Sequence, residues 1–441
     1  MDYKNYTKQL EPLISFKSIS TDPAYKSEII KAVKWIEKYL NDSGFTTELW
    51  QGEISNPVVF GTIEVDPAFE TVLVYGHYDV QPANISDGWE KDPFELFEKG
   101  DRLIARGVVD NKGQFFIHMY TVCELIKTKR LKYNVKFLIE GNEETSNTEL
   151  ASQLQKNKDK LTADYIMVSD GELIGTNPVI EYSLRGGFNC KITYTTAKNN
   201  LHSGLYGGAV PNSAQELSAF LNKVFTSGKV AFDWFYKDVD EISQQQQEQN
   251  TKAVENLESI LDNIGVKKLT TESELDLLSQ VGLRPTIQIT GFKAGYTEEG
   301  YANIVPAQAE VRLNFRTVMF QNTEEIKNKF ADFVKQNTPA YIKYELEFTN
   351  AYNPIKIDTS SQIFSKVRTV LETAFGKPAL SKPVGGGIPV VNDFKSVLGK
   401  DTLLVSLGND DCNMHGVNEN FNIKLLEKGL TFSENFFTKK D

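Results

Sequence analysis

The chain has few cysteines and no long apolar segment. Its 441 residues include only three cysteines, Cys123, Cys190 and Cys412, too few and too scattered for a disulfide framework. No apolar run reaches the roughly 18 residues of a membrane-spanning helix. The first residues, MDYKNYTKQLEPL, lack the apolar stretch of a secretory signal. We therefore expect a cytoplasmic protein that has no membrane partner.

Positive charge is also scarce. The 48 lysines and arginines are outnumbered by 59 aspartates and glutamates, which gives a net charge of −11. A nucleic-acid partner would require a basic face, so we expect none. A Walker loop, a G-x-S-x-G elbow and a G-x-G-x-x-G fingerprint are all absent from the sequence. These absences disfavour both nucleotide enzymes and serine hydrolases.

Hydrophobic periodicity predicts two domains, as expected for a chain of this length. Helical periodicity is seen at residues 28–41 and 112–129, and short apolar runs typical of buried strands lie at 71–75, 135–139, 165–168 and 402–405. Continuous apolar strands separated by helices are typical of an α/β fold with a largely parallel sheet that is covered on both faces. This pattern predicts a helix-flanked catalytic domain.

The middle of the chain has a different pattern. Alternating strands are predicted at 189–195, 284–292, 307–315 and 341–348, and helices at 211–225 and 323–336. The order β-α-β-β-α-β fits a ferredoxin-like domain with one exposed sheet face. Because the buried pattern returns at about residue 353, we expect a catalytic domain of residues 1–184 and 353–441, interrupted by an inserted domain of residues 185–352. Within it, residues 228–282 form a polar insertion whose Gln-rich tract favours an exposed helix or loop over an interaction segment.

Six acidic or histidine residues follow the predicted strands or precede the predicted helix 112–129: His77, Asp110, Glu143, Glu144, Asp170 and His415. In open α/β sheets, ligands bind beyond the carboxyl ends of the strands. Carboxylates gathered there are unfavourable unless cations neutralise them. Mixed histidine and carboxylate ligands suit zinc, with manganese or cobalt as alternatives. These residues predict a divalent-metal site, and a carboxylate shared between two ions would give the two-metal arrangement of aminopeptidases.

Each of these residues has an ordinary structural explanation when taken alone. A histidine at a strand end is usually structural, and an acidic pair such as Glu143 and Glu144 is usually a solvated turn. The convergence of all six on one sheet edge is what favours a metal site. Cys412 and His415 resemble half a zinc finger, but no second pair exists, so we expect Cys412 to be a packed loop residue. We expect His118, in the middle of a predicted helix, to be a core residue.

The segments GHYDVQP, ARGVVDNKGQ, EGNEETSN, SDG, LHSG and HGVNE occur in an order and spacing that carry a resemblance. The chain resembles the aminoacylase, carboxypeptidase G and carnosinase-like family of co-catalytic metallopeptidases over nearly its whole length. The resemblance is strongest to the cytosolic nonspecific dipeptidase and carnosinase branch. It implies that the inserted domain serves as a lid and as the contact surface of a homodimer.

The resemblance also implies how the ligands are divided between two ions. His77 and Asp170 would hold one ion. Glu144 and His415 would hold the other, and Asp110 would bridge both.

Other roles are implied for neighbouring residues. Glu143 would act as the general base, and Asp79 would accept a hydrogen bond from the His77 imidazole and fix its tautomer. Family members often have a cis peptide bond after the bridging aspartate. We therefore expect one at Asp110–Asn111.

The inserted domain and a late loop supply the residues expected to contact the substrate. His202, in LHSG, resembles an oxyanion-stabilising histidine that is donated by the partner subunit. Asn303 and Arg316 match residues that hold the carboxylate end of the substrate, a task that suits the planar arginine fork. Gly386 and Gly387 match a loop that contributes backbone groups to the same carboxylate.

The expected activity is two-metal hydrolysis of the peptide bond in dipeptides or short peptides with a free C-terminal carboxylate. Zinc is the expected ion, with manganese or cobalt as alternatives, and Glu143 would take the proton of the attacking water. An N-acyl amino-acid deacylase or desuccinylase would use the same machinery and differ in what fills the amino-side pocket. A noncatalytic metal-binding scaffold is disfavoured, because it would not need a general base.

Overall fold

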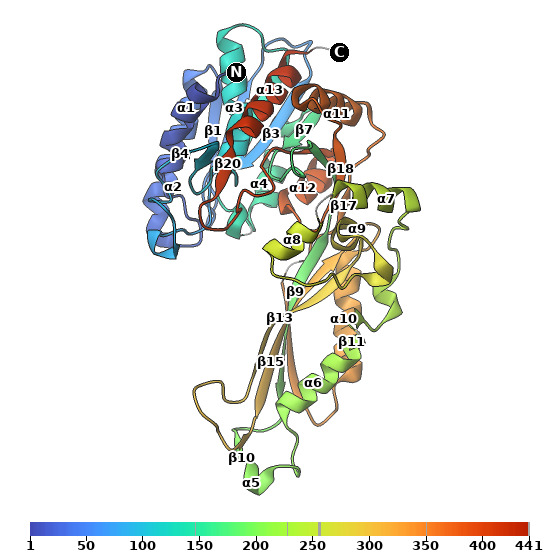
Figure 1. The fold of residues 1–441 in the computed structure, drawn as a ribbon. Coiled ribbons are helices and arrows are strands. Elements are labelled where there is room, and N and C mark those ends of the chain that lie inside the picture. The colour runs from blue at the N-terminus through green and yellow to red at the C-terminus, as the bar shows by residue number, and fades with distance from the viewer. Residues whose placement is uncertain (146, 227, 255–256, 350, 440–441) are drawn as a thin grey trace. The chain divides into compact units, whose positions relative to one another are not determined.

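The structure is a computed structural model that describes residues 1–145, 147–226, 228–254, 257–349 and 351–439 (Figure 1). Ser146 of the EGNEETSN segment and residues 255–256 of the predicted polar insertion lie outside the described residues. The chain divides into two compact units. Unit 1 comprises Met1–Tyr182, Ile357–Lys382 and Pro389–Asp441, and unit 2 comprises Ser183–Lys356 and Pro383–Ile388.

Unit 1 is built on a sheet with the strand order β1-β2-β6-β3-β7-β19-β8. Its strands are β1 Thr46–Trp50, β2 Val58–Ile63, β3 Thr71–His77, β6 Asn134–Glu140, β7 Tyr165–Val168, β8 Val179–Leu184 and β19 Thr402–Ser406. The central strands β6, β3, β7 and β19 are mutually parallel, whereas the pairs β1–β2, β2–β6 and β19–β8 are antiparallel. The four predicted buried strands are these central ones, and they form the parallel part of the sheet.

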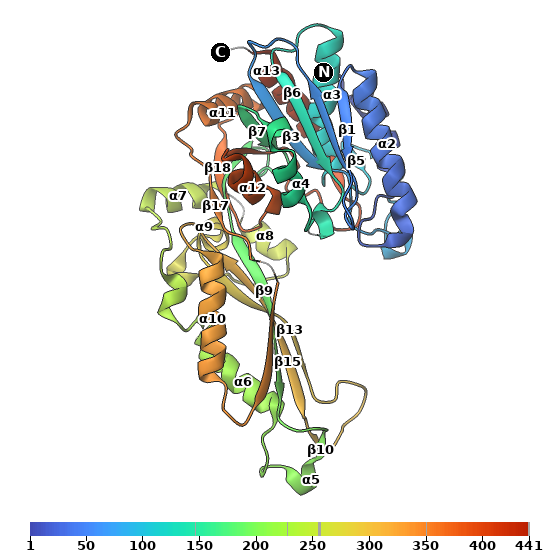
Figure 2. The same ribbon diagram turned by 180° about the vertical axis from the view of Figure 1, so that it is seen from behind.

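Helices cover both faces of this sheet. They are α1 Tyr3–Ser15, α2 Lys26–Asp42, α3 Lys112–Lys127, α4 Leu150–Lys156, α11 Gln362–Phe375, α12 Pro389–Asp393 and α13 Ile423–Thr438. α3 and α13 lie on one face and α4 and α12 on the other (Figures 1 and 2). A small separate sheet is formed by β4 Phe97–Lys99, β5 Arg102–Ile104 and β20 Asn420–Asn422, in the order β20-β5-β4. The coverage of both faces explains why the central strands are apolar throughout.

Unit 2 is built on an antiparallel sheet with the strand order β13-β15-β9-β16. Its elements are β9 Gly186–Thr195, α6 Ser213–Val224, β13 Thr286–Ala294, β15 Gln308–Thr317, α10 Thr323–Asn337 and β16 Lys343–Phe348. Their order is the predicted β-α-β-β-α-β. Alternate residues of β9 and β15 pack with α6 and α10 in one hydrophobic core, so both helices cover the same face of the sheet (Figure 1).

Shorter elements complete unit 2. Near the start of β15 lie β10 Leu201–His202, α5 Ser203–Tyr206 and β14 Ile304–Val305, and β17 Ile355–Lys356 pairs with the end of β8. β11 Phe225–Thr226 precedes the predicted polar insertion, which contains β12 Lys229–Val230, α7 Gln244–Ala253, α8 Leu257–Asn263 and most of α9 Leu277–Leu283. The Gln-rich tract thus forms a largely exposed helix, α7. Among the described helices, none is both long and apolar enough to cross a membrane.

Candidate metal centre

The parallel strands bring the predicted metal ligands to one edge of the unit 1 sheet. β3 ends at His77, and Glu143 and Glu144 follow shortly after β6. Asp170 follows β7, and the loop after β19 carries His415. Because parallel strands share the edge at which they end, residues far apart in sequence meet there.

His77, Asp110 and Asp170 form the first group of candidate ligands. The Nε2 atom of His77 lies 3.2 Å from Oδ1 of Asp110 and 3.7 Å from Oδ2 of Asp170. The side-chain amide of Asn111 donates to Oδ1 of Asp170 at 2.7 Å. The Asp110–Asn111 peptide bond is cis, as expected.

Asp110, Glu144 and His415 form the second group. The Nε2 atom of His415 lies 2.7 Å from Oδ2 of Asp110 and 3.4 Å from Oε2 of Glu144. The amide of Gln81 donates to Oε2 of Glu144 at 2.7 Å. Asp110 therefore faces each group with a different carboxylate oxygen, the arrangement that a bridging ligand requires.

Asp79 is buried beside both groups. The Nδ1 atom of His77 lies 3.1 Å from the Asp79 carbonyl oxygen and 3.4 Å from its carboxylate Oδ1. The carboxylate also accepts from Ser20 Oγ at 2.7 Å and from the backbone N–H groups of Glu143 and Glu144 at 3.3 and 3.2 Å. Asp79 thus contacts the His77 ring and also holds the turn that presents the two glutamates.

The charges of this edge depend on one another. Burial would raise the pKa of Asp110, but the neighbouring imidazole rings of His415 and His77 lower it below its usual range. Asp110 and Glu144 raise the pKa of His415 to about 10. Burial, reinforced by the charge of Asp170, raises the pKa of Glu143 well above its ordinary value. The carboxylates therefore require nearby positive charge.

Divalent ions fit this requirement. Among the described residues, the buried Nε2 of His77 and Oε1 of Glu144 have no hydrogen-bond partner, although both belong to the candidate groups. Imidazole nitrogens and carboxylate oxygens are ligands that zinc and related ions take. The residues present are suitable for two ions that share Asp110.

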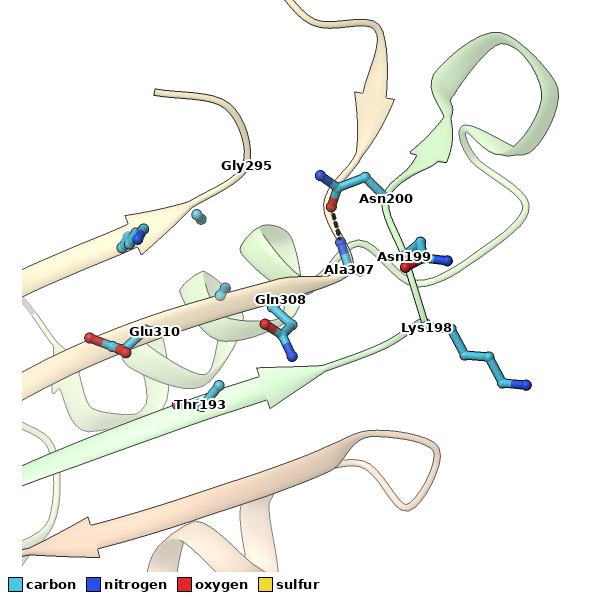
Figure 3. A pocket seen from close by; sticks show the side chains of 11 residues that line it. Thr193, Lys198, Asn199, Asn200, Gly295, Ala307, Gln308 and Glu310 are labelled. Carbon is cyan, nitrogen blue, oxygen red and sulfur yellow. Dashed lines mark hydrogen bonds between the residues drawn. The ribbon is translucent and has the colours of Figure 1, made fainter. Parts of the chain in front are cut away.

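His202 and Asn303 lie together in unit 2. His202 ends β10 and Asn303 directly precedes β14, the strand that pairs with β10, and Ser203 N–H donates to the Asn303 carbonyl oxygen at 3.0 Å. Asn200 accepts from Ala307 N–H at 3.0 Å, which holds this segment beside the start of β15 (Figure 3). The His202 ring is exposed and accepts from Gly204 N–H at 3.0 Å. A pocket of about 440 Å³ nearby contains none of the predicted site residues (Figure 3).

Arg316 and the glycine loop form a separate group in unit 2. Arg316, near the end of β15, donates to the Tyr352 hydroxyl at 2.7 Å. A Cβ added to Gly387 would lie 2.8 Å from the Arg185 carbonyl oxygen and 2.9 Å from the Tyr352 ring. The loop therefore approaches its neighbours too closely for a side chain at Gly387, and any help that it gives a substrate comes from its backbone.

Arg185 is a residue of this group that we did not predict. Its backbone N–H and Nε donate to the carbonyl oxygens of Gly386 and Gly385 at 3.1 and 2.7 Å. Burial and the charge of Arg316 lower the pKa of Arg185 to about 10. Among the described residues, neither arginine has a carboxylate partner, which makes this group suited to an anion. Arg185 lies in none of the motifs that we identified in the sequence.

Two residues that we predicted to be structural are structural. His118 is fully buried in α3, with its ring nitrogens 3.1 Å from Ser433 Oγ and 2.9 Å from Ser169 Oγ. Cys412 is buried and donates to a Glu172 carboxylate oxygen at 3.1 Å.

Comparison with known proteins identifies the family. Residues 73–439 match the model of peptidase family M20/M25/M40. The chain belongs to this family. This chain is 26% identical to the Cys-Gly metallodipeptidase DUG1 of Saccharomyces cerevisiae, over 96% of its own length and 93% of that protein. It is 28% identical to the Beta-Ala-His dipeptidase of Homo sapiens, over 83% of its own length and 74% of that protein.

A solved structure agrees with this assignment. An M20 family metallo-carboxypeptidase, Sso-CP2 from Sulfolobus solfataricus, matches with a TM-score of 0.87 and 26% sequence identity, covering 99% of each chain. The predicted family and α/β fold are therefore confirmed, and the chain is a metal-dependent peptidase with candidate ligand groups in unit 1.

Proposed function

We propose that this M20 peptidase is a dipeptidase that uses two divalent ions, with zinc as the first choice and manganese or cobalt as alternatives. The position of Asp110 between the two histidines supports this proposal most strongly. Its Oδ1 lies 3.2 Å from Nε2 of His77, and its Oδ2 lies 2.7 Å from Nε2 of His415. The names of two relatives, Cys-Gly metallodipeptidase and Beta-Ala-His dipeptidase, indicate dipeptides as the substrate class.

In the proposed reaction, Glu143 is the general base. When bound, the two ions would acidify a water molecule and polarise the substrate carbonyl. Glu143 belongs to neither candidate ligand group, and burial favours its protonated form, so it is suited to accept a proton from the attacking water. The protonated Glu143 then donates this proton to the leaving nitrogen. Asp79 is hydrogen-bonded to both the His77 ring and the backbone N–H of Glu143, and so fixes the position of the base relative to the ligands.

The carboxylate end of the substrate would bind to Arg316 and the backbone of Gly386 and Gly387, with Asn303, which lies beside His202, as a further contact from a second chain. A guanidinium without a carboxylate partner binds such a group through paired, charge-assisted hydrogen bonds. Arg185 adds positive charge there and holds the glycine loop by its carbonyl groups. A free carboxylate on the substrate is therefore the expected requirement.

His202 would stabilise the oxyanion of the reaction in the partner subunit of a homodimer. Asn200 holds the His202 segment at the start of β15, whereas Arg316 lies eight residues beyond Gln308, which is about 27 Å along an antiparallel strand. In a dipeptide, the scissile carbonyl and the terminal carboxylate are only about 4 Å apart. One chain therefore cannot bring its own His202 and Arg316 to the same dipeptide, and a second chain would supply the histidine.

A substrate panel tests the proposed function. The metal-stripped chain, supplied with Zn²⁺, Mn²⁺ or Co²⁺, is assayed on Cys-Gly, β-Ala-His, other dipeptides, their C-terminal amides and N-acetyl amino acids. We expect hydrolysis of free dipeptides, loss of at least about 90% of that rate with the amides, and little with N-acetyl amino acids. Preferential cleavage of the N-acetyl compounds would instead identify a deacylase.

A cytoplasmic location is part of the proposal and is consistent with three buried cysteines that form no disulfide bond.

A further inference from the structure

The loop that carries His415 has a backbone that residues with a Cβ rarely adopt. Asn413, His415 and Asn418 have φ angles of 56°, 60° and 55°, in the left-handed region that disfavours residues other than glycine. The side chain of His415 is 52% exposed, so burial of its ring does not hold it in place. Contacts elsewhere must keep the loop in this conformation.

A buried ion pair lies beneath this loop. Arg106 and Glu419 are 3% and 0% exposed, and Nη1 of Arg106 lies 2.8 Å from Oε2 of Glu419. The carboxylate also accepts from the backbone N–H groups of Gly107, Val109 and Asp110 at 2.9, 2.8 and 3.0 Å. Glu419 is therefore fixed to the segment that ends at the shared aspartate.

Arg106 makes the contact on the other side. Its Nη2 atom donates to the carbonyl oxygens of His415 and Gly416 at 3.3 and 3.1 Å. Its own backbone N–H donates to the Pro93 carbonyl oxygen at 2.7 Å, and its guanidinium lies over the Trp89 ring at 5.3 Å. A continuous set of contacts thus runs from the His415 backbone through Arg106 and Glu419 to the Asp110 backbone.

We infer that the Arg106–Glu419 pair is a positioning device that sets the separation of Asp110 and His415, and with it the affinity of the second ion site. This inference rests on the proposed function. Among the described residues, neither side chain belongs to a candidate ligand group, and their hydrogen bonds to His415 and Asp110 run to the backbone. Both act through the backbone of residues that belong to such a group. A buried pair is suited to this task, because removing one partner leaves an unpaired charge that the structure must rearrange to accommodate.

Arg102 offers a matched control. It also holds the His415 loop, through paired hydrogen bonds of 2.7 Å to the two carboxylate oxygens of Asp411 and one of 2.9 Å to Asn420. Among the described residues it contacts neither His415 nor Asp110. An effect of loop stability alone would therefore appear in both arginine variants, whereas a positioning effect would appear only at Arg106.

The test is a calorimetric titration of the metal-stripped, full-length chain with Co²⁺, which measures an affinity for each site. In Arg106→Met and Glu419→Gln we expect the affinity of the site that contains His415 to fall by about 10- to 100-fold, the range typical of residues that orient metal ligands, and the other affinity to fall by less. In Arg106→Lys the same affinity should fall by less, and in Arg102→Met both affinities should stay at their wild-type values. If Arg106→Met does not fold, Arg106→Lys and Glu419→Gln decide the question.

Wild-type affinities for both ions in the Arg106 and Glu419 variants would overturn the inference, as would equal losses in Arg102→Met. Equal weakening of both sites would also contradict it, because that outcome indicates a general loss of structure. A wild-type chain that binds fewer than two ions would instead contradict the proposed function. The two failures are therefore distinguishable.

Discussion

Glu143 and Glu144 are neighbours in the sequence but have different surroundings. The carboxylate of Glu144 lies 3.4 Å from His415 and accepts from Gln81, as expected of an oriented ligand. Glu143 belongs to neither ligand group, and burial raises its pKa. One side chain is therefore suited to hold an ion and the other to move a proton.

This difference predicts that two similar substitutions affect activity and metal content differently. Glu143→Gln should lower kcat by about 10²- to 10⁴-fold, the usual contribution of a general base, while the metal content of the protein stays at its wild-type value. Glu144→Gln should lose metal from one site. Elemental analysis and steady-state kinetics measure both effects. Equal metal loss in the two variants would show that we have assigned the base and the ligand wrongly.

The role of Arg316 is tested by its substrate dependence. Arg316→Ala should raise KM for dipeptides by about 10-fold or more, because a charge-assisted contact with the carboxylate is lost. Amidation of the substrate should affect the wild type similarly and add little to the variant. Arg312→Ala is the control, since Arg312 lies on the same strand and pairs with Glu310 at the surface. If the effects of Arg316→Ala and of amidation simply add, Arg316 does not bind the carboxylate.

At the scale of single elements, the central strands and their ends could be predicted from the sequence. An apolar run such as that of β3 identifies a buried strand, and His77 at its end identifies the functional edge. The antiparallel edges could not be predicted, because an apolar pattern does not specify which strands pair or in which direction. Arg106 was equally hidden, because nothing in the sequence around it indicates that Glu419, more than three hundred positions later, pairs with it.

The packing of α3 against α13 leads to a prediction about pH. Burial lowers the pKa of His118 to about 3, from an ordinary value of about 6.5. The folded protein keeps the ring neutral, while the unfolded chain takes up a proton below pH 6.5. The free energy of unfolding therefore has its full contribution from neutral His118 above pH 6.5, and this contribution is lost as the pH falls toward 3.

The substitution His118→Gln removes the titrating ring and supplies an amide, which can donate and accept hydrogen bonds, beside the two serines that contact His118. In chelator-treated protein, the variant should lose less of its Tm than the wild type between pH 7.5 and pH 5. Thermal unfolding followed by circular dichroism measures the two slopes. Parallel slopes would mean that His118 does not contribute to acid sensitivity.

At the scale of the whole molecule, the proposed active site requires two chains. His202→Ala should keep its fold and metal but lose about 10²- to 10³-fold in kcat, as when one oxyanion donor is removed. A mixed dimer of His202→Ala and Glu143→Gln chains, isolated with two different tags, should regain about half of the wild-type activity. One of its sites then combines an intact Glu143 with the His202 of the partner. An inactive mixed dimer would contradict the exchange of His202 between chains.

The central claim is that two ions, held by ligands that share Asp110, support peptide hydrolysis by this chain. The most direct measurement is a stepwise titration of the metal-stripped wild type with Zn²⁺ or Mn²⁺, in which bound metal per chain and dipeptide hydrolysis are followed in the same samples. The account predicts almost no activity without metal and a plateau of activity at two bound ions per chain. Full activity at one ion per chain, or in the stripped protein, would contradict it.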